Sequence, residues 1–493
     1  MNTPCRLSVF DVELFEQPFR LRMPFRFGVI TVTHGTQAFA RVRVRLEDGR
    51  EGDGFAAEAL AAKWFDKDPA LSDAQNVDQL RKAIEITAAA YRSAPLLSPF
   101  DLFAEHHAAQ LAAGAECGLL PLVASFGPAL LDRAVLDAVC RILGISFWTA
   151  MCTNVVGMRG HPIAPDLERF DFDGFLAGLK PAPTIAARHT VGLVDPIVAA
   201  DQPAGSRVDD GLPETLEEVV ATYGHTYFKL KVSGQLEADL ERLTRIAGVL
   251  DRIVEPLHIT LDGNEQYDDV EAVVALWRAM AEAPALRRLC ASTLFIEQPI
   301  KRQVALSRSV APLARLRPLI IDESDGDLDA FPHARALGYA GVSSKACKGF
   351  YKSLLNLARC REWNARGQGN AGSQGHASGQ GRFFMSGEDL TTQAGICVQQ
   401  DLALVSLLGL THVERNGHHF IDGFAGRPKA ETEDFLAAHP DVYHRQDGRV
   451  RLHIEGGLLQ LGSLECAGFG TSVTPDLSTT AIMPKADWPP GRF

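Results

Sequence analysis

Apolar and polar residues alternate along Ala38–Leu46, which is the two-residue period of a β-strand with one buried face. The dipeptide Asp48-Gly49 follows, and this pair is a strong signal for a tight turn between antiparallel strands. Farther along, apolar residues recur with the helical period from Leu130 to Leu143, and Gly144 suits the end of a helix. The pattern predicts an opening region of mixed α+β structure.

From about Thr184 onward, short apolar strands alternate with amphipathic helices. We expect strands at Thr226–Val232, Leu257–Leu261, Thr293–Ile296, Leu319–Ile321, Gly341–Ser344 and Phe383–Met385. Helices are expected at Glu237–Leu250 and Val270–Ala281. This alternation predicts a parallel sheet, either open or closed as a barrel.

The amino-acid composition narrows the class of protein. The chain has 493 residues, 46% of them apolar, which predicts two or three domains with a large core. We see no membrane span of roughly 20 apolar residues, and Asp11, Glu13 and Glu16 interrupt the region where a secretory signal would be apolar. The nine cysteines form no Cys-x-x-Cys pair, which favours reduced thiols. We therefore expect a cytoplasmic protein with no membrane partner.

The net charge of the chain indicates which classes of partner it can bind. The net charge is −12 and the chain has no Lys/Arg-rich run, so we expect no nucleic-acid partner. An acidic balance still permits an anionic substrate, because a bound metal ion sets the local field.

One segment, Asn364–Gly381, is biased to Gly, Gln, Ser and Asn. It contains Gly367–Gly372, which formally matches the dinucleotide-binding pattern G-x-G-x-x-G. The match follows a helix and precedes a strand, the reverse of the dinucleotide context, so a mobile surface loop is the better interpretation.

Charged residues stand at the ends of successive predicted strands. Lys229 and Lys231 share one face of the first strand, because side chains alternate along it. The following strands end in Asp262, in Glu297, in Asp322 with Glu323, and in Lys345, at steps of about 20–35 residues, the size of one βα unit. The carboxyl ends of barrel strands converge on the face where active sites lie, so we expect these side chains to meet.

The carboxylates of this set predict a metal site. Three carboxylates brought together repel each other, and this repulsion raises their pKa values. A hard divalent cation relieves the repulsion, and oxygen ligands suit Mg²⁺ best, with Mn²⁺ as the alternative. We therefore expect Asp262, Glu297 and Asp322 to bind the metal ion.

The lysines suit removal of the proton next to a carboxylate. A metal ion that grips the substrate carboxylate stabilises the enediolate that forms. A neutral lysine must then take the proton, and Lys229 beside Lys231 would lower the pKa of Lys231. Lys345, from a strand on the far side of the site, would serve the opposite face. Each motif alone is common loop or turn material, so the prediction depends on their regular order.

This ordered series resembles the enolase superfamily, and within it the muconate lactonizing enzyme-like and mandelate racemase-like subgroup. The motifs are Lys229-x-Lys231, Asp262-x-Asn264, Glu297-x-Pro299, Asp322-Glu323-Ser324 and Lys345-x-x-Lys348-Gly349. Outside them, Gly54, Asp132-x-Ala134, Asp137, Gly144, Glu455-Gly-Gly457 and Gly468-Phe-Gly470 resemble the family's capping region and its return from the C-terminus. The resemblance covers most of the chain.

The resemblance implies a modified TIM (β/α)7β-type barrel with an α+β capping domain. The capping domain would comprise residues 1–183, the barrel residues 184–425, and residues 426–493 would return to the cap. It also implies Mg²⁺ on Asp262, Glu297 and Asp322, an acid/base pair of Lys231 and Lys345 with Lys229 tuning Lys231, and a mobile loop near Pro24–His34 that folds over the substrate.

Other side chains are weaker candidates. Asn264 and Glu323 are expected to support the metal ligands from behind. Substrate contacts are expected from Phe27, Ser386, Glu388 and Glu414. His412, His418 and His419 follow the eighth strand, where histidines are more often polar surface, and we expect Lys348 to be structural.

Three departures from the family leave the substrate open. Extra material occurs near 96–120, 155–183 and 435–452, and Ala467 replaces the usual proline before the C-terminal Gly-x-Gly. The Asp-x-Asp of dipeptide epimerases is absent, since Val413–Asn416 stands there. We expect an isomerase or lyase, namely a racemase, epimerase or cycloisomerase that acts on a small carboxylate, in a homo-oligomer. The alternatives are an acid-sugar or hydroxy-acid dehydratase on the same site, and a non-catalytic binding protein on a degenerate barrel.

Overall fold

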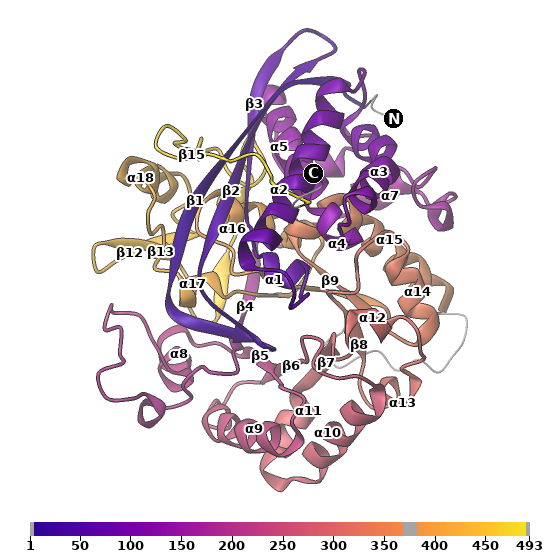
Figure 1. The fold of residues 1–493 in the computed structure, drawn as a ribbon. Coiled ribbons are helices and arrows are strands. Elements are labelled where there is room, and N and C mark those ends of the chain that lie inside the picture. The colour runs from indigo at the N-terminus through magenta and orange to yellow at the C-terminus, as the bar shows by residue number, and fades with distance from the viewer. Residues whose placement is uncertain (1–3, 368–381, 490–493) are drawn as a thin grey trace.

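An antiparallel sheet opens the computed structural model, which describes residues 4–367 and 382–489 (Figure 1). The sheet consists of β1 (Leu7–Phe27), β2 (Ile30–Leu46), β3 (Glu51–Ala59) and β15 (Ala481–Ile482), in the order β15-β1-β2-β3. The predicted hairpin is confirmed, because β2 pairs with β3 around Gly49, whose φ is +88°. Residues 368–381, most of the expected surface loop, lie outside the described residues.

Helices cover this sheet. They are α1 (Ala62–Phe65), α2 (Asp73–Ser93), α3 (Pro99–Glu116), α4 (Pro121–Ala124), α5 (Phe126–Leu143), α6 (Phe147–Cys152) and α7 (Phe172–Ala177). The helix predicted up to Leu143 is confirmed as part of α5, which ends at Gly144 in the left-handed conformation. Helix α5 packs so tightly on β3 that a Cβ at Gly54 would lie 2.0 Å from the Ala134 carbonyl oxygen. Only glycine fits there.

A buried carboxylate joins the two ends of the chain. Asp137 on α5 accepts a hydrogen bond from the Phe55 N–H at 2.9 Å and another from the Phe469 N–H at 2.7 Å. Arg141 donates to the same carboxylate at 2.7 Å. Asp137 thus fixes β3 and the C-terminal segment to one helix.

A second buried carboxylate of α5 predicts a pH dependence of stability. Tyr91 donates a hydrogen bond to Asp132 at 2.6 Å, and burial raises the pKa of Asp132 to about 8. The folded state then holds a proton that the unfolded state releases near pH 4, so the free energy of unfolding falls as pH rises from about 4 to about 8. Asp132→Asn keeps the acceptor for Tyr91 and removes the titration. Its stability advantage over the parent should grow across this window by up to about 5 kcal/mol, measured by urea unfolding.

The exposed Glu105 on α3 supplies the control for this experiment. Glu105→Gln should leave the pH profile of the parent unchanged. A constant difference between Asp132→Asn and the parent from pH 4 to 8 would contradict the prediction, because it would mean that Asp132 titrates alike in the folded and unfolded states.

Eight parallel strands in the described part of the chain close into a barrel. They are β4 (Thr184–Val191), β5 (Tyr227–Lys231), β6 (His258–Asp262), β7 (Thr293–Glu297), β8 (Leu319–Ile321), β9 (Gly341–Ser344), β10 (Phe384–Gly387) and β11 (His412–Glu414). Strand β11 closes on β4 through the pairs His412↔Ala186 and Glu414↔Arg188. Strand β14 (Leu458–Gln460) adds to β4 antiparallel. The closed form of the predicted parallel sheet is therefore confirmed.

The strand connections surround the barrel, and the yellow C-terminal segment runs back beside the N-terminal sheet (Figure 1). The α-helices are α8 (Leu216–Tyr223), α9 (Leu236–Leu250), α10 (Val270–Glu282), α11 (Arg287–Ser292), α12 (Arg302–Ala305), α13 (Ala311–Ala314), α14 (Ala330–Leu337), α15 (Phe350–Gly367), α16 (Ile396–Leu407), α17 (Gly417–Phe420) and α18 (Lys429–Ala438). A small hairpin follows, β12 (Tyr443–Gln446) with β13 (Arg449–Leu452). Among the described residues, none of the helices combines the length and the apolar character needed to cross a bilayer.

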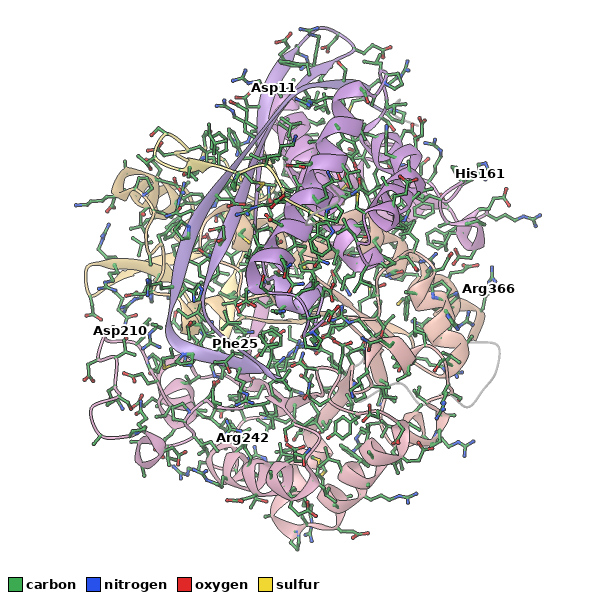
Figure 2. All side chains as sticks on the ribbon, in the orientation of Figure 1. Asp11, Phe25, His161, Asp210, Arg242 and Arg366 are labelled. Carbon is green, nitrogen blue, oxygen red and sulfur yellow. The ribbon has the colours of Figure 1, made fainter. Side chains whose placement is uncertain are left out.

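The segment near Pro24–His34 differs from the expected loop. Strands β1 and β2 continue through it as a paired hairpin, with Phe25 opposite Val32 and Phe27 opposite Ile30. Alternating apolar residues such as Phe25 and Phe27 bury one face of this hairpin and keep it in strand form. Figure 1 shows the hairpin descending from the cap to the barrel, and Figure 2 marks Phe25 near its lower end.

Candidate active site

A cavity of about 310 Å³ lies between the end of the β1–β2 hairpin and the carboxyl ends of the barrel strands. Its upper wall is apolar and includes Phe19, Leu21, Phe25, Phe27, Ile30 and Val32 from the hairpin. Trp64 on α1 adds a further aromatic side chain. Its floor is polar and includes Lys229, Lys231, Asp262, Asn264, Lys345, Asp389, Glu414 and Asn416. An apolar pocket with a few convergent polar groups is the usual form of a small-molecule site.

Two buried lysines reach this cavity from strand ends that are far apart in the barrel. Lys231 ends β5, and its Nζ donates to Asp262 at 2.6 Å. Lys345 follows β9; its Nζ donates to Asp322 at 2.6 Å and lies 4.2 Å from the centroid of the Trp64 ring. Burial alone would lower the pKa of Lys345, but the attraction of Asp322 outweighs it and raises that pKa. Lys345 is therefore held in its protonated form.

Lys229 is surrounded by carboxylates. Its Nζ lies 2.8 Å from oxygens of Asp262 and Glu297, and 2.9 Å from oxygens of Glu388 and Glu414. Burial opposes the charge, but the four carboxylates outweigh burial and hold the pKa of Lys229 well above its usual range. Lys229 is thus a fixed positive charge beneath the cavity.

Glu297 carries the clearest sign of an unmet electrostatic requirement. Both of its oxygens are buried and accept no hydrogen bond of good geometry, although one lies 2.8 Å from Lys229 Nζ. Burial raises the pKa of Glu297 well above its usual range, and the charges of Asp262 and Glu388 raise it further. Buried carboxylate oxygens without donors are what a hard cation would satisfy.

Asp322, the third expected metal ligand, has its own set of donors. Lys345 and Ser343 donate to it, and Lys348 Nζ lies 3.6 Å from its Oδ1. Within the described ranges, the oxygens of Asp262, Glu297 and Asp322 do not form a set mutually within 4.8 Å. Lysine ammonium groups separate them and supply the positive charge that the carboxylates require. The oxygen donors fit Mg²⁺ in type, and binding would require the lysines to yield their places.

Asn264 and Glu323, which were expected to support the metal ligands, lie in contact with each other. Asn264 donates to Glu323 at 3.3 Å, and its own N–H bonds to Asp262 at 2.8 Å. Lys67, in the segment between α1 and α2, reaches down to Glu323 at 3.1 Å and to Glu265 at 2.6 Å. This contact between cap and barrel was not anticipated from the sequence, because Lys67 has no motif around it.

The expected substrate contacts fall into two groups. Phe27 and Glu414 line the cavity. Ser386 and Glu388 do not line it. They lie in the barrel interior, where Ser386 donates to Glu388 and both bond to Arg188, and their contact with a substrate stays a prediction. The sequence analysis did not predict Arg188 on β4. An arginine within a strand usually indicates a solvent-exposed face, and only the closed barrel shows that this side chain points to the interior.

The weaker candidates also find their places. Lys348 lies 2.8 Å from Asp325 and donates to Ser343 at 2.7 Å, an arrangement consistent with a structural role. His412 contacts Arg188 at 2.5 Å inside the barrel. His418 and His419 were expected on the surface, yet His419 is 2% exposed and both ring nitrogens of His418 are buried.

Solved structures match this chain over nearly its whole length, whereas no family model and no curated protein matches it. A dipeptide epimerase from Enterococcus faecalis V583, complexed with Mg and L-Leu-L-Tyr, has a TM-score of 0.56 at 14% identity, covering 94% of this chain and 99% of its own. An enolase from Bradyrhizobium, complexed with magnesium and mandelic acid, has a TM-score of 0.55 at 15% identity, covering 98% and 100%.

The L-Ala-D/L-Glu epimerase from Bacillus subtilis, in a substrate-liganded complex, has a TM-score of 0.52 at 15% identity, covering 94% of this chain and 98% of its own. At these identities the likeness concerns the fold. The chain therefore has the fold of the enolase-type structures, a closed barrel with a cap, and this part of the prediction is confirmed.

Proposed function

We propose that this chain, with its enolase-type fold, is an enzyme that removes and returns the proton next to a carboxylate, as in a racemase or epimerase. The observation that carries the proposal is the placement of Lys231 and Lys345 at one cavity, on strands β5 and β9 of the barrel. Two lysines on opposite sides of one carbon permit removal of a proton on one side and delivery on the other. Reaction of either enantiomer needs no further acid or base.

The lysines have distinct partners in this mechanism. Lys345, protonated beside Asp322, is the proton donor in the resting site. Lys231 is the opposing base, and Lys229 lies beside it as a permanent positive charge paired with Asp262 at 2.8 Å. Asp262, Glu297 and Asp322 would hold Mg²⁺. When bound, that ion polarises the substrate carboxylate and stabilises the charge that develops upon deprotonation.

The substrate side chain that suits this cavity is apolar. The hairpin wall is mainly aromatic and aliphatic, with polar Thr31, Thr33 and His34 beside them. Most charged groups lie on the floor, and Lys63 on α1 and Asp73 on α2 are the charged residues at the cap side. A substrate would therefore place its carboxylate at the floor and an apolar group beneath Phe25 and Phe27. The same lysines would serve elimination of a β-substituent, so a dehydratase remains the alternative, and assembly as a homo-oligomer stays a prediction.

Hydrogen exchange tests the proposed reaction directly. The protein is incubated with Mg²⁺ in deuterated water and a library of chiral carboxylic acids that differ in the size of an apolar side chain. We expect deuterium to enter at the α-carbon of at least one apolar acid, with inversion of configuration. Exchange accompanied by loss of a β-substituent would favour the dehydratase, and no exchange across the library would overturn the proposal.

Substitution of the hairpin wall should change substrate preference. Phe27 is 8% exposed and lines the cavity, so Phe27→Ala removes apolar contact with a bulky substrate. We expect kcat/KM for such a substrate to fall about 10–200-fold, with little change for a small one. Val29, at the hairpin tip and 71% exposed, is the control, and Val29→Ala should match the parent. Equal losses on bulky and small substrates would contradict a role in specificity.

A further inference from the structure

Three histidines from distant parts of the chain meet outside the barrel. His189 lies on β4, His225 follows α8, and His418 lies on α17. One ring nitrogen from each lies within 4.8 Å of the others. Side chains alternate along β4, and since Arg188 and Thr190 bond to Glu388 and Glu414 of the barrel interior, His189 points to the outside. The cluster is therefore separate from the cavity with the lysines.

Four ring nitrogens of this cluster are buried without a hydrogen-bond partner. His189 and His225 are 3% and 1% exposed, and neither His189 Nδ1 nor His225 Nε2 has a hydrogen bond. Both nitrogens of His418 are also buried without a partner. Buried polar groups are hydrogen-bonded in the large majority of cases, so unpartnered nitrogens gathered at one point call for a ligand.

His225 is already oriented as a metal ligand would be. Its Nδ1 lies 2.9 Å from the Ala187 carbonyl oxygen, so Nδ1–H donates there and the lone pair is on Nε2. Metal-binding histidines characteristically donate their other ring N–H to a carbonyl or carboxylate. Burial lowers the pKa of His225 to about 4, and it lowers the pKa values of His189 and His418 well below their usual range. All three rings are therefore neutral at pH 7.

We propose that His189, His225 and His418 bind one divalent transition-metal ion, Zn²⁺ in the first instance. Neutral imidazoles suit Zn²⁺, Cu²⁺ and Ni²⁺, whereas Mg²⁺ takes oxygen ligands. Nitrogens in a tetrahedral Zn²⁺ site lie about 3.4 Å apart, given bonds of about 2.1 Å, so binding draws the ring nitrogens together by no more than about 1.4 Å from the limit of 4.8 Å. A cavity of about 20 Å³ beside His418 has room for one water, and neither His189 nor His225 lines it.

Nearby positive charges do not oppose the cation strongly, because each is already paired. Arg22 is close enough to lower the pKa of His418, but it forms a two-pronged ion pair with Asp210 at 2.6 Å. Arg415 lies between Asp389 and Asp401 and bonds to the latter.

A metal ion at this site would hold α17, which contacts the β1–β2 hairpin above the active-site cavity, against the barrel. The three ligands join β4, the start of β5 and α17. On α17, the ring of Phe420 lies 4.6 Å from that of Phe25, which is part of the cavity wall. A metal ion here would tie the hairpin contact to the outside of the barrel, a structural role distinct from the reaction.

The test uses the full-length protein, stripped with a chelator and then equilibrated with Zn²⁺ in the presence of excess Mg²⁺, which competes for the carboxylates. We expect one bound Zn²⁺ per chain by elemental analysis. A rise in Tm of about 2–3 °C is expected when Zn²⁺ is at 100 times its Kd. Co²⁺ in place of Zn²⁺ should give the visible absorption of a tetrahedral complex.

His225→Asn and His418→Ala are the decisive variants. Asparagine places an amide N–H where His225 Nδ1 donates to Ala187, so the fold contact is kept and only the ligand atom is lost. Both variants should lose the bound Zn²⁺ and the shift in Tm. His439 is equally buried but bonds to Ser463 and Thr471, so His439→Asn is the control and should retain the metal.

The proposal is overturned if the folded parent binds no Zn²⁺, or if His225→Asn and His418→Ala bind it as the parent does. Should His225→Asn fail to fold, His418→Ala decides, because its position on a short helix makes it the milder change. Loss of exchange activity alone would neither support nor overturn the proposal, because the test measures bound metal and Tm.

Discussion

Lys231→Ala should abolish exchange of the α-proton of one enantiomer, and Lys345→Ala should abolish exchange of the other. The reason is geometric, because the two lysines reach the cavity from β5 and β9 and, in the proposed reaction, would act on opposite sides of the substrate carbon. Loss of a general base costs roughly 10²–10⁴-fold in rate. Deuterium incorporation into each pure enantiomer, followed separately by NMR, measures this split.

Two controls make the lysine experiment specific. Lys301 is half-exposed and pairs with Asp268 on the outside, so Lys301→Ala should exchange both enantiomers at the parent rate. Binding of Mg²⁺ should persist in both active-site variants, which separates loss of a base from loss of the metal site. If Lys231→Ala and Lys345→Ala each exchange both enantiomers at the parent rate, the lysines are not the bases. A dehydratase would give an asymmetric result, with one variant losing all exchange and the other mainly losing elimination.

Glu297→Gln should have two opposite effects. The variant should lose Mg²⁺ binding and about 10³-fold or more in exchange rate, because the ion supplies several kcal/mol of charge stabilisation. In the absence of metal, the same variant should be more stable than the parent by about 1–3 kcal/mol, because the Glu297 oxygens are buried without a hydrogen bond of good geometry and their charge is repelled by Asp262 and Glu388. Isothermal titration with Mg²⁺ and urea unfolding in chelator measure the two effects.

The stability effect of Glu297 depends on pH with a defined sign. Burial raises the pKa of Glu297 in the folded state, so the free energy of unfolding of the parent falls as pH rises above about 4.5, the value of a free glutamate. The advantage of Glu297→Gln should therefore widen over the same interval. Asp268→Asn, at an exposed position, should change neither stability nor metal binding. A metal-free Glu297→Gln protein that is less stable than the parent would contradict this account.

The barrel could be predicted because its signals are local. Each strand ends in a charged residue that follows a short apolar run, as at Asp262 and Asp322. This pattern can be recognised in the sequence without knowledge of the fold. The hairpin of the cap was partly misread for the opposite reason. The turn at Gly28 and Val29 interrupts the alternation of apolar and polar residues, so the segment was predicted as a loop. The pairing of Phe27 with Ile30 across this turn is seen only in the structure.

Contacts between residues far apart in the chain could not be predicted from the sequence. Arg188 bonds to Glu388 two hundred positions away, and Lys67 bonds to Glu323 across the boundary between cap and barrel. No local period marks such pairs, because each is created by closure of the barrel or by docking of the cap. The ion pairs of Asp262, Glu297 and Asp322 with lysine side chains belong to the same class, since no local pattern shows which lysine reaches which carboxylate.

The hydrogen bonds of Asp137 also govern the order in which the chain can acquire its structure. Phe55 and Phe469 bond to the same carboxylate, and β15 at Ala481–Ile482 pairs with β1 near Phe15. During synthesis the N-terminal sheet emerges first, yet it must wait for several hundred further residues before its edge strand and its buried acceptor find their partners. The N-terminal sheet thus cannot be completed until residues near position 480 are available, and its unpaired edge is exposed to aggregation until then.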